Sequence, residues 1–385
     1  MQSWRECKLG DVINLKRGYD LPRQDRTPGP YPIVSSSGIT DYHEKAKVKG
    51  PGVVTGRYGT LGEVFYVEDD FWPLNTSLYI EDFKGNDPRF ISYFLRQLNF
   101  GSRNAAGAVP GVNRNHLHAM KVRLPSPGLQ RRIAGLLSAY DDLIENNQRR
   151  IKILEEMARS LYREWFVNFR FPGQEKFPLI DSPLGSVPKG WEVEKLGDLT
   201  AYLNRGLSPS YDENGGSIVI NQKCIRDQRL SLEPARRQTK QIPPDKRVRF
   251  GDVLINSTGV GTLGRVAQVY EELGDCTVDS HVTIARPNDQ ICLDFFGCTL
   301  LVQQETFDRL GAGATGQTEL SRTSIANVDL VVPPIEIQDR FGVIVRPMRT
   351  AAMTYTKQIQ NLRRTRDLLL PRLLSGQLEP PRGAA

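Results

Sequence analysis

The chain has 385 residues, 39% of them hydrophobic and 25% charged, which is ordinary for a globular protein of two or three domains with buried cores. No apolar run approaches the roughly 18 residues of a membrane-spanning helix, and the charged start MQSWRECKLGDV lacks the apolar stretch of a secretory signal. A net charge of +7 permits nucleic-acid binding without establishing it.

The cysteines indicate the compartment. Cys7, Cys224, Cys276, Cys292 and Cys298 are odd in number and form no C-x-x-C pair. This pattern argues against a structural zinc site and against a disulfide framework. We therefore expect free thiols in a reducing cytoplasm.

In chain order, the sequence predicts a Gly- and Pro-rich globular part, a long helix, a linker, a second globular part, a second long helix and a tail. Short runs such as GVVTG, GEVFYV, DVLINS and RVAQV are typical of strands joined by turns. Short helices are expected at 88–99 and 294–309. The fold class is therefore α+β, with an irregular sheet or barrel in each globular part. The predicted bounds are 1–129, 130–170, 171–190, 191–337, 338–378 and 379–385.

Ordered internal matches indicate that the chain is a duplication. The segment 4–11 matches 191–198, and Gly-Thr-Leu-Gly at 59–62 returns at 261–264. LNTSLYI at 74–80 aligns with VDSHVTI at 278–284, and Pro125 and Gln130 align with Pro333 and Gln338. The offset only grows, from 187 to 208 residues, as expected if the second copy gained loop residues. The glycines of the repeated turn favour tight or positive-φ geometry.

Both predicted long helices carry apolar residues in the a/d steps of a heptad repeat, in the same phase. We expect them to pack as an antiparallel coiled coil with pseudo-two-fold symmetry, because the first is rich in acids such as Asp141 and Glu155 and the second in bases such as Lys357. Two helices that merely cap their own domains remain the alternative. Pro347 should kink or restart the second helix and Pro371 should fray its end. The seam residues include Ile144, Asn147, Ile151, Leu154, Leu161, Tyr355, Ile359, Leu362 and Leu369, of which polar Asn147 would fix the register.

The motifs of several enzyme classes are absent from the sequence. Gly-Lys, the core of a phosphate-binding P-loop, never occurs, and no Pro-Pro pair has the context of an amino-methyltransferase motif. The close pair His116 and His118 has no third ligand nearby, so polarity of a loop explains it better than a metal. We therefore predict a chain that is not an enzyme and that binds no cofactor or metal itself.

Polar residues beside the repeated glycine turns suit DNA, since Arg and Lys match guanine or phosphate, and Asn and Gln match adenine. Ordinary loop polarity competes for each one singly, but the clusters fall at corresponding places in both copies. The candidates in the first copy are Arg57, Tyr58, Asn75, Thr76, Ser77, Arg103, Asn104, Asn113, Arg114 and Asn115. Those in the second are Asn221, Gln222, Lys223, Ser257, Thr258, His281, Gln317 and Arg322.

Over nearly its full length the chain resembles the specificity (S) subunit of type I restriction–modification enzymes. The segments that carry the resemblance are 133–173, 182–191, 195–198 and 368–378. The resemblance implies two target-recognition domains, each reading one half of a bipartite site in double-stranded DNA. It implies that the helices set the spacer and dock two methyltransferase subunits, with a restriction and translocase subunit joining the complex. S-adenosylmethionine, and ATP with Mg²⁺, would then belong to those partners. Trp165, Phe166 and Phe169 are candidates for subunit-binding surface, with core packing as the alternative.

Two other classes of protein compete with this interpretation. One is an enzyme, a nuclease or methyltransferase with a degenerate site. The other is a scaffold whose coiled coil joins proteins and whose globular domains bind something other than DNA.

Overall fold

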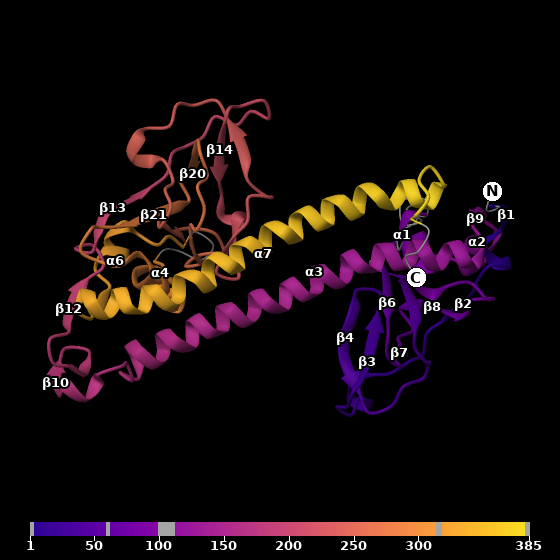
Figure 1. The fold of residues 1–385 in the computed structure, drawn as a ribbon, viewed down its shortest axis with the longest axis horizontal. Coiled ribbons are helices and arrows are strands. Elements are labelled where there is room, and N and C mark those ends of the chain that lie inside the picture. The colour runs from indigo at the N-terminus through magenta and orange to yellow at the C-terminus, as the bar shows by residue number, and fades with distance from the viewer. Residues whose placement is uncertain (1–3, 59–61, 99–111, 313–317, 382–385) are drawn as a thin grey trace. The chain divides into compact units, whose positions relative to one another are not determined.

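The computed structural model describes residues 4–58, 62–98, 112–312 and 318–381. It confirms the α+β class: several small sheets accompany two long helices, α3 (Pro127–Tyr162) and α7 (Ile335–Ser375) (Figure 1). The chain forms two compact units, Met1–Asn146 with Gln358–Ala385 (unit 1) and Asn147–Lys357 (unit 2). Each long helix therefore contributes one part to each unit.

The described residues of unit 1 form three sheets and two short helices beside the long ones. Its four-stranded sheet has the order β2 (Asn14–Arg17), β8 (Ser77–Asp82), β5 (Gly52–Gly56), β6 (Val64–Val67). Its three-stranded sheet has the order β4 (Gly38–His43), β3 (Tyr31–Ser35), β7 (Trp72–Pro73). β1 (Arg5–Lys8) pairs with β9 (Lys121–Leu124), and the helices are α1 (Pro88–Gln97) and α2 (Arg114–Ala119).

Unit 2 repeats this arrangement. Its four-stranded sheet has the order β13 (Thr200–Arg205), β21 (Val282–Pro287), β18 (Val253–Asn256), β19 (Val266–Gln268). Its three-stranded sheet has the order β17 (Arg236–Gln238), β14 (Ser217–Ile220), β20 (Cys276–Val278). β12 (Glu192–Lys195) pairs with β22 (Asp329–Val332), and the helices are α4 (Leu293–Val302), α5 (Gln304–Arg309) and α6 (Arg322–Ala326).

Two hairpins and several short turns complete the described structure. The hairpins are β10 (Leu179–Ser182) with β11 (Gly185–Pro188), and β15 (Ile225–Arg226) with β16 (Arg229–Leu230). Single 3-10 turns occupy Leu9–Asp11, Arg23–Asp25, Gln174–Lys176, Gln222–Cys224 and Pro244–Lys246, and a π-helical turn, Arg163–Val167, follows α3.

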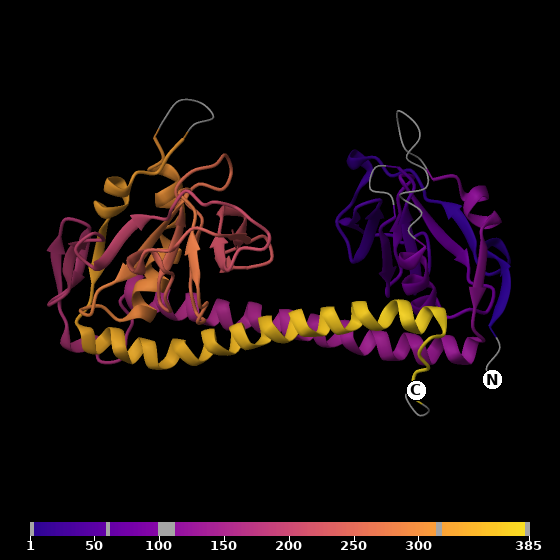
Figure 2. The same cartoon turned by 90° about the horizontal axis from the view of Figure 1, so that it is seen from above.

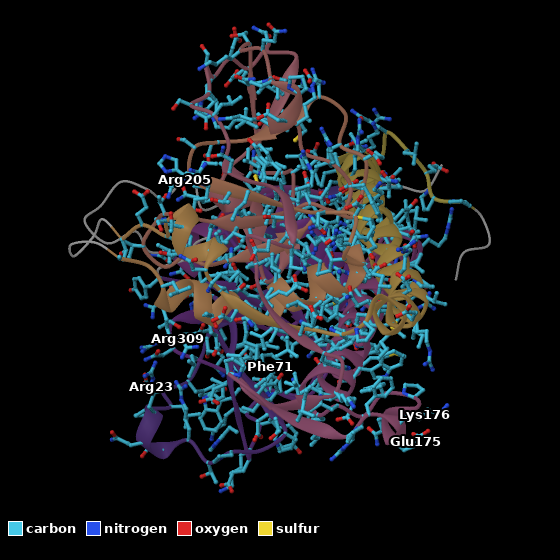
Figure 3. All side chains as sticks on the ribbon, turned by 90° about the vertical axis from the view of Figure 1, so that its left-hand side faces the viewer. Arg23, Phe71, Glu175, Lys176, Arg205 and Arg309 are labelled. Carbon is cyan, nitrogen blue, oxygen red and sulfur yellow. The ribbon has the colours of Figure 1, made fainter. Side chains whose placement is uncertain are left out.

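In both units the four-stranded sheet lies between the helices and the three-stranded sheet. Val53 of β5 faces a core that includes α1, α3 and the end of α7, whereas the next residue, Val54, faces β3 and the fully buried Phe71 (labelled in Figure 3). In β18, Val253 likewise faces the core that includes α3, α4 and α7, and Leu254 faces the core that includes β14 and β20. This is the period-two alternation of a sheet buried on both faces. Figure 2 shows α7 running beneath the strands of unit 2.

The shared topology confirms the internal repeat and corrects one equivalence. Strand order and pairing sense agree throughout, including the parallel pairs β3–β7 and β14–β20. The Leu74 N–H donates to the Val34 carbonyl as the Asp279 N–H donates to the Ile220 carbonyl. Leu74 is therefore equivalent to Asp279 and not to Val278, because backbone pairing fixes the register where two loosely similar sequences do not.

A buried glutamine joins each globular part to the start of its long helix. Gln130 accepts from the Asp87 N–H at 3.0 Å and donates to the Pro125 carbonyl at 3.0 Å. Gln338 accepts from the Cys292 N–H at 3.0 Å and donates to the Pro333 carbonyl at 2.7 Å. Asp87 and Cys292 are the N-cap residues of α1 and α4. The Pro and Gln matches in the sequence therefore mark one conserved joint in both copies.

All the predicted seam positions of α3 and α7 are buried or half-buried, Asn147 included. In unit 1 Leu137 packs in one core with Leu373, and Asp141 bonds Arg366. In unit 2 Tyr162 packs on Phe341, and Arg150 contacts Tyr355. Residue numbers rise along one helix as they fall along the other, so the two helices are antiparallel within each unit.

The prolines of α7 do not interrupt it. α7 neither restarts at Pro347 nor frays at Pro371, since it continues to Ser375. A kink at Pro347 stays a prediction. Each proline frees the carbonyl four residues earlier, at Val343 and Asp367, and both residues are exposed, so water can satisfy those carbonyls.

Several charged residues of the long helices bond the globular parts. Asp141 does meet Arg366, but Glu155 bonds Arg229 of the β15–β16 hairpin and Lys357 bonds Glu271. These pairs tie helix to domain.

The aromatic residues at the end of α3 belong to the core. Trp165 and Phe166 are buried in the main core of unit 2, and Phe169 packs against it. Core packing is therefore the correct alternative for this aromatic cluster.

No helix in the described part of the chain is long and apolar enough to cross a membrane.

We predict that Gln338→Ala destabilises the chain by about 2–4 kcal/mol, because it leaves a buried N–H and a buried carbonyl without partners. Urea unfolding of the purified chain measures this. Gln360→Ala, at an exposed position of the same helix, is the matched control and should stay within about 0.5 kcal/mol of the parent. Equal effects of the two substitutions would show that the Gln338 hydrogen bonds do not stabilise the fold.

The repeated glycine turn gives a second prediction. Gly261 and Gly264 have φ of +71° and +77°, but a Cβ on Gly261 meets nothing within 4 Å, whereas one on Gly264 would lie 2.5 Å from the Asp308 amide nitrogen of α5. Gly261→Ala should cost about 1–2 kcal/mol from backbone strain alone, and Gly264→Ala about 1–3 kcal/mol more from overpacking. Unfolding midpoints in the opposite order would show that contact with α5 does not constrain the turn.

Candidate nucleic-acid interface

In unit 1 three predicted segments meet through backbone hydrogen bonds. The Arg57 N–H donates to the Thr76 carbonyl at 2.9 Å, and the Val112 N–H donates to the Arg57 carbonyl at 2.9 Å. The end of β5, the turn before β8 and the approach to α2 therefore lie together. We call this arrangement the three-segment junction.

Unit 2 has the same junction. The Ser257 N–H donates to the His281 carbonyl at 2.8 Å, and the Leu320 N–H donates to the Ser257 carbonyl at 2.8 Å. Arg57 is thus equivalent to Ser257, and Thr76 to His281. The repeated glycine turn alone would place Arg57 and Tyr58 opposite Gly259 and Val260, and two extra residues before that turn in the second copy account for the shift. The backbone repeats while the side chains differ.

The side chains of the unit 2 junction form a hydrogen-bonded row. The Gln222 Nε2 donates to the Thr258 carbonyl at 2.7 Å and to its Oγ1 at 2.8 Å, and that Oγ1 lies 2.9 Å from the His281 Nδ1. Below the row, the buried Asn256 donates to the Gln222 carbonyl at 3.1 Å, and its Oδ1 has no partner. Lys223 and His281 are exposed, and Asn221 and Gln222 are half-buried.

The unit 1 junction presents different chemistry. The Arg57 guanidinium lies 4.6 Å from the centre of the exposed Tyr58 ring. Asn75 bonds the Asp20 carboxylate, and Thr76 is exposed. A cation over an aromatic ring replaces the amide, hydroxyl and imidazole row of unit 2.

A short helix follows the junction in both units and carries an exposed arginine at its first residue, Arg114 in α2 and Arg322 in α6. Asn113 caps α2 by accepting from the Asn115 N–H, and Ser321 caps α6 by accepting from the Ser324 N–H. Arg205, labelled in Figure 3, holds the segment before α6 by binding the Glu319 carboxylate at 2.8 Å and the Leu320 carbonyl at 3.0 Å.

The structure removes two residues from the predicted set. Ser77 and Ser257 are fully buried. The Ser77 Oγ donates to the Leu74 carbonyl at 2.7 Å, and the Ser257 Oγ lies 2.6 Å from the Thr283 Oγ1. Both hydroxyls therefore serve the fold. Arg103, Asn104 and Gln317 lie outside the described residues.

Of the histidine pair in unit 1, His118 has a structural role. The His118 Nε2 accepts from the Leu15 N–H at 3.0 Å, and burial lowers the pKa of His118, which keeps the ring neutral and able to accept. Within the described ranges, no group of three or more His, Cys, Asp or Glu is placed to hold a metal ion.

Sequence reasoning missed Tyr211 and Arg236, whose side chains stack beside the unit 2 junction. The cluster of basic residues between 223 and 249 was the available signal. Together the junctions offer exposed amide, hydroxyl, imidazole and guanidinium groups, which are the groups that bind base edges and phosphates.

Comparison with known proteins agrees with this geometry. The family described as type I restriction modification DNA specificity domain matches residues 1–156 and 188–362. The type I restriction enzyme MjaIX specificity subunit of Methanocaldococcus jannaschii is 27% identical over 310 residues, 75% of this chain and 66% of that one. The HindI specificity subunit of Haemophilus influenzae is 21% identical over 98% of this chain and 100% of its own length.

A solved structure shares the fold. The S subunit of a type I restriction-modification system from M. genitalium matches with a TM-score of 0.69 and 17% identity, covering 97% of this chain and 96% of that chain. The family match includes both copies of the repeat and confirms the resemblance to specificity subunits. The chain belongs to the family of type I restriction modification DNA specificity domains.

Proposed function

We propose that this chain is the sequence-specificity subunit of a type I restriction–modification complex and has no catalysis of its own. Each globular domain reads one half of a bipartite site in double-stranded DNA. The observation that carries the proposal is the three-segment junction, which has one backbone arrangement in both units and different exposed side chains. Two domains that descend from one ancestor can read two different short sequences in this way. Of the predicted residues, Arg57 and Tyr58 are the foremost candidates in the first domain, and Gln222, Thr258 and His281 in the second.

The proposal includes a role for the helices. We infer that α3 and α7 form one antiparallel coiled coil that separates a first domain over 1–129 from a second over 191–337. Support comes from the buried seam residues and the antiparallel order seen within each unit. Such a pair would set the length of the unread spacer between the half-sites.

The proposed partners are two methyltransferase subunits, with a restriction and translocase subunit joining them. Exposed apolar residues on the outer face of α3 support a docking role, notably Ile153 and Met157, whose side chains have no place in either core and are 58% and 49% exposed. S-adenosylmethionine, and ATP with Mg²⁺, would be bound by these partners. A DNA substrate implies a cytoplasmic protein.

The test is to map methylated bases on genomic DNA after incubation with the chain, its methyltransferase partner and S-adenosylmethionine. We expect methylation in two short sequences separated by a fixed unread spacer, and none without the partner. Methylation by the chain alone would indicate a degenerate enzyme. A complex that methylates with no sequence preference would contradict the proposal and favour a scaffold.

Shortening the helices gives a further prediction. Deleting one heptad from each, 145–151 and 353–359, preserves the a/d phase and removes about 10 Å of helix. The spacer should shorten by about three base pairs, while both half-site sequences stay the same. Deleting the heptad from α3 alone disrupts the seam and is the control, for which we expect loss of methylation. A changed half-site sequence in the double deletion would contradict the division of labour.

A further inference from the structure

Positive charge is distributed unevenly within the second domain. Residues 191–334 hold 15 Lys and Arg against 19 Asp and Glu, so this part of the chain is net acidic. Residues 222–250 alone hold nine Lys and Arg against three Asp and Glu. The corresponding stretch of the first domain, 36–50, holds three against two and shows no such concentration. A net-acidic domain that approaches a polyanion has to present its cations on the approaching face.

The fold assembles part of this stretch into a platform. The loop before β14 pairs with the outer edge of β17, since the Thr239 N–H donates to the Ser210 carbonyl and the Asp212 N–H to the Arg237 carbonyl, each at 3.1 Å. Residues 236, 238 and 240 then point to the same side. On that side Gln238 is buried and Arg236 is exposed. The three-stranded sheet that contains β17 lies on the side of unit 2 away from α7 (Figure 1).

The Arg236 guanidinium carbon lies 3.5 Å from the centre of the Tyr211 ring, and the Lys240 Nζ donates to the Ser208 carbonyl at 3.2 Å. Stacking on a ring fixes the plane of a guanidinium and leaves its N–H groups free at the edge, which suits two-point recognition of phosphate oxygens. We call Tyr211, Arg236 and Lys240 the Tyr211 platform.

The charge of the platform is not neutralised internally. Arg229 and Arg247 of the same stretch form ion pairs with Glu155 and Asp275. Within the described residues, by contrast, no carboxylate lies in ion-pair distance of Arg236 or Lys240. The neighbouring Asp212 uses its Oδ1 to accept from the Asn214 N–H at 2.8 Å, and the exposed Glu213 lies next to it. These two acids mark one border of the positive surface.

The platform adjoins the unit 2 junction. Asn221, beside Gln222, donates from Nδ2 to the Pro234 carbonyl at 2.7 Å, two residues before Arg236. On the other side, Asp279 accepts from the His281 N–H at 2.9 Å. Burial, with the charge of Asp279, raises the pKa of Tyr211, which places that ring near the same turn.

We propose that the Tyr211 platform grips the DNA backbone beside the half-site read by the second domain, with Arg236 and Lys240 each neutralising one phosphate. The proposal rests on the DNA-reading function proposed above. It extends that function to residues that contribute to DNA affinity without contributing to sequence specificity. The corresponding stretch of the first domain, 36–50, has no such excess of cations, so we expect the phosphate contacts to be unequal in the two halves.

The test is binding of the full chain with its methyltransferase partner to a duplex that holds its site, as a function of salt. Neutralising two phosphate contacts in Arg236→Gln with Lys240→Gln should reduce the slope of log K against log salt by about 2, and weaken binding roughly tenfold or more near physiological salt. The methylated sequence should not change. Arg226→Gln removes an exposed arginine of the β15–β16 hairpin that lies beside Asp227, and as the matched control it should leave the slope at the parent value.

Arg236→Lys separates charge from stacking. This variant should have the same salt slope as the parent, because Lys keeps the positive charge. Its affinity should stay below that of the parent, because Lys lacks the planar guanidinium. An unchanged salt slope in the double variant would overturn the proposed phosphate contacts. A relaxed sequence preference at one base pair would also overturn them, because it would show that Arg236 contacts a base. Failure of the parent complex to prefer any site would instead overturn the proposed function itself.

Discussion

The fold depends on the burial of one face of each four-stranded sheet against the two long helices. Val53 and Leu78 in unit 1 share a core with Leu137 of α3 and Leu373 of α7. In unit 2 the corresponding core includes Tyr162 of α3 and Phe341 of α7 together with β18 and α4. Neither globular part can bury this face without both helices, because the other side of its sheet is already covered. Folding of the globular parts and pairing of the helices are therefore thermodynamically coupled.

This constraint separates what has to stay constant from what can vary. The glutamine joints at Gln130 and Gln338 and the backbone bonds of the three-segment junction repeat in both units. These groups are buried and hydrogen-bonded, so changing them costs stability. The exposed side chains beyond them, a Tyr–Arg pair in one unit and a Gln–Thr–His row in the other, have no such cost. A surface of that kind can acquire a new binding preference without a new fold.

The sequence was sufficient for the features that have a period or a repeat. Heptad spacing located α3 and α7 and all of their seam positions, and ordered matches located the two copies. Local features were harder. The burial of Ser77 and Ser257 depends on partners, Leu74 and Thr283, that only strand pairing supplies. Tyr211 and Arg236 meet because a loop pairs with the edge of β17, and no spacing along the chain encodes that contact.

In a duplicated chain, the start of each long helix could pack on the wrong globular part. The polar contacts between helix and globular part differ in the two units, and this difference disfavours such an exchange. In unit 1 the helix is acidic where it meets α1, since Asp142 of α3 pairs with Arg89. In unit 2 the polarity is reversed, since Arg346 of α7 pairs with Asp294 of α4. Arg89 and Asp294 occupy equivalent positions, since each is the second residue of its short helix. By the Gln130–Gln338 equivalence, exchange of the helices would set Ser138 in the place of Arg346. The buried Asp294 would then lack its cation, a cost of several kcal/mol for an unpaired buried charge. Two similar halves thus remain distinguishable to the folding chain.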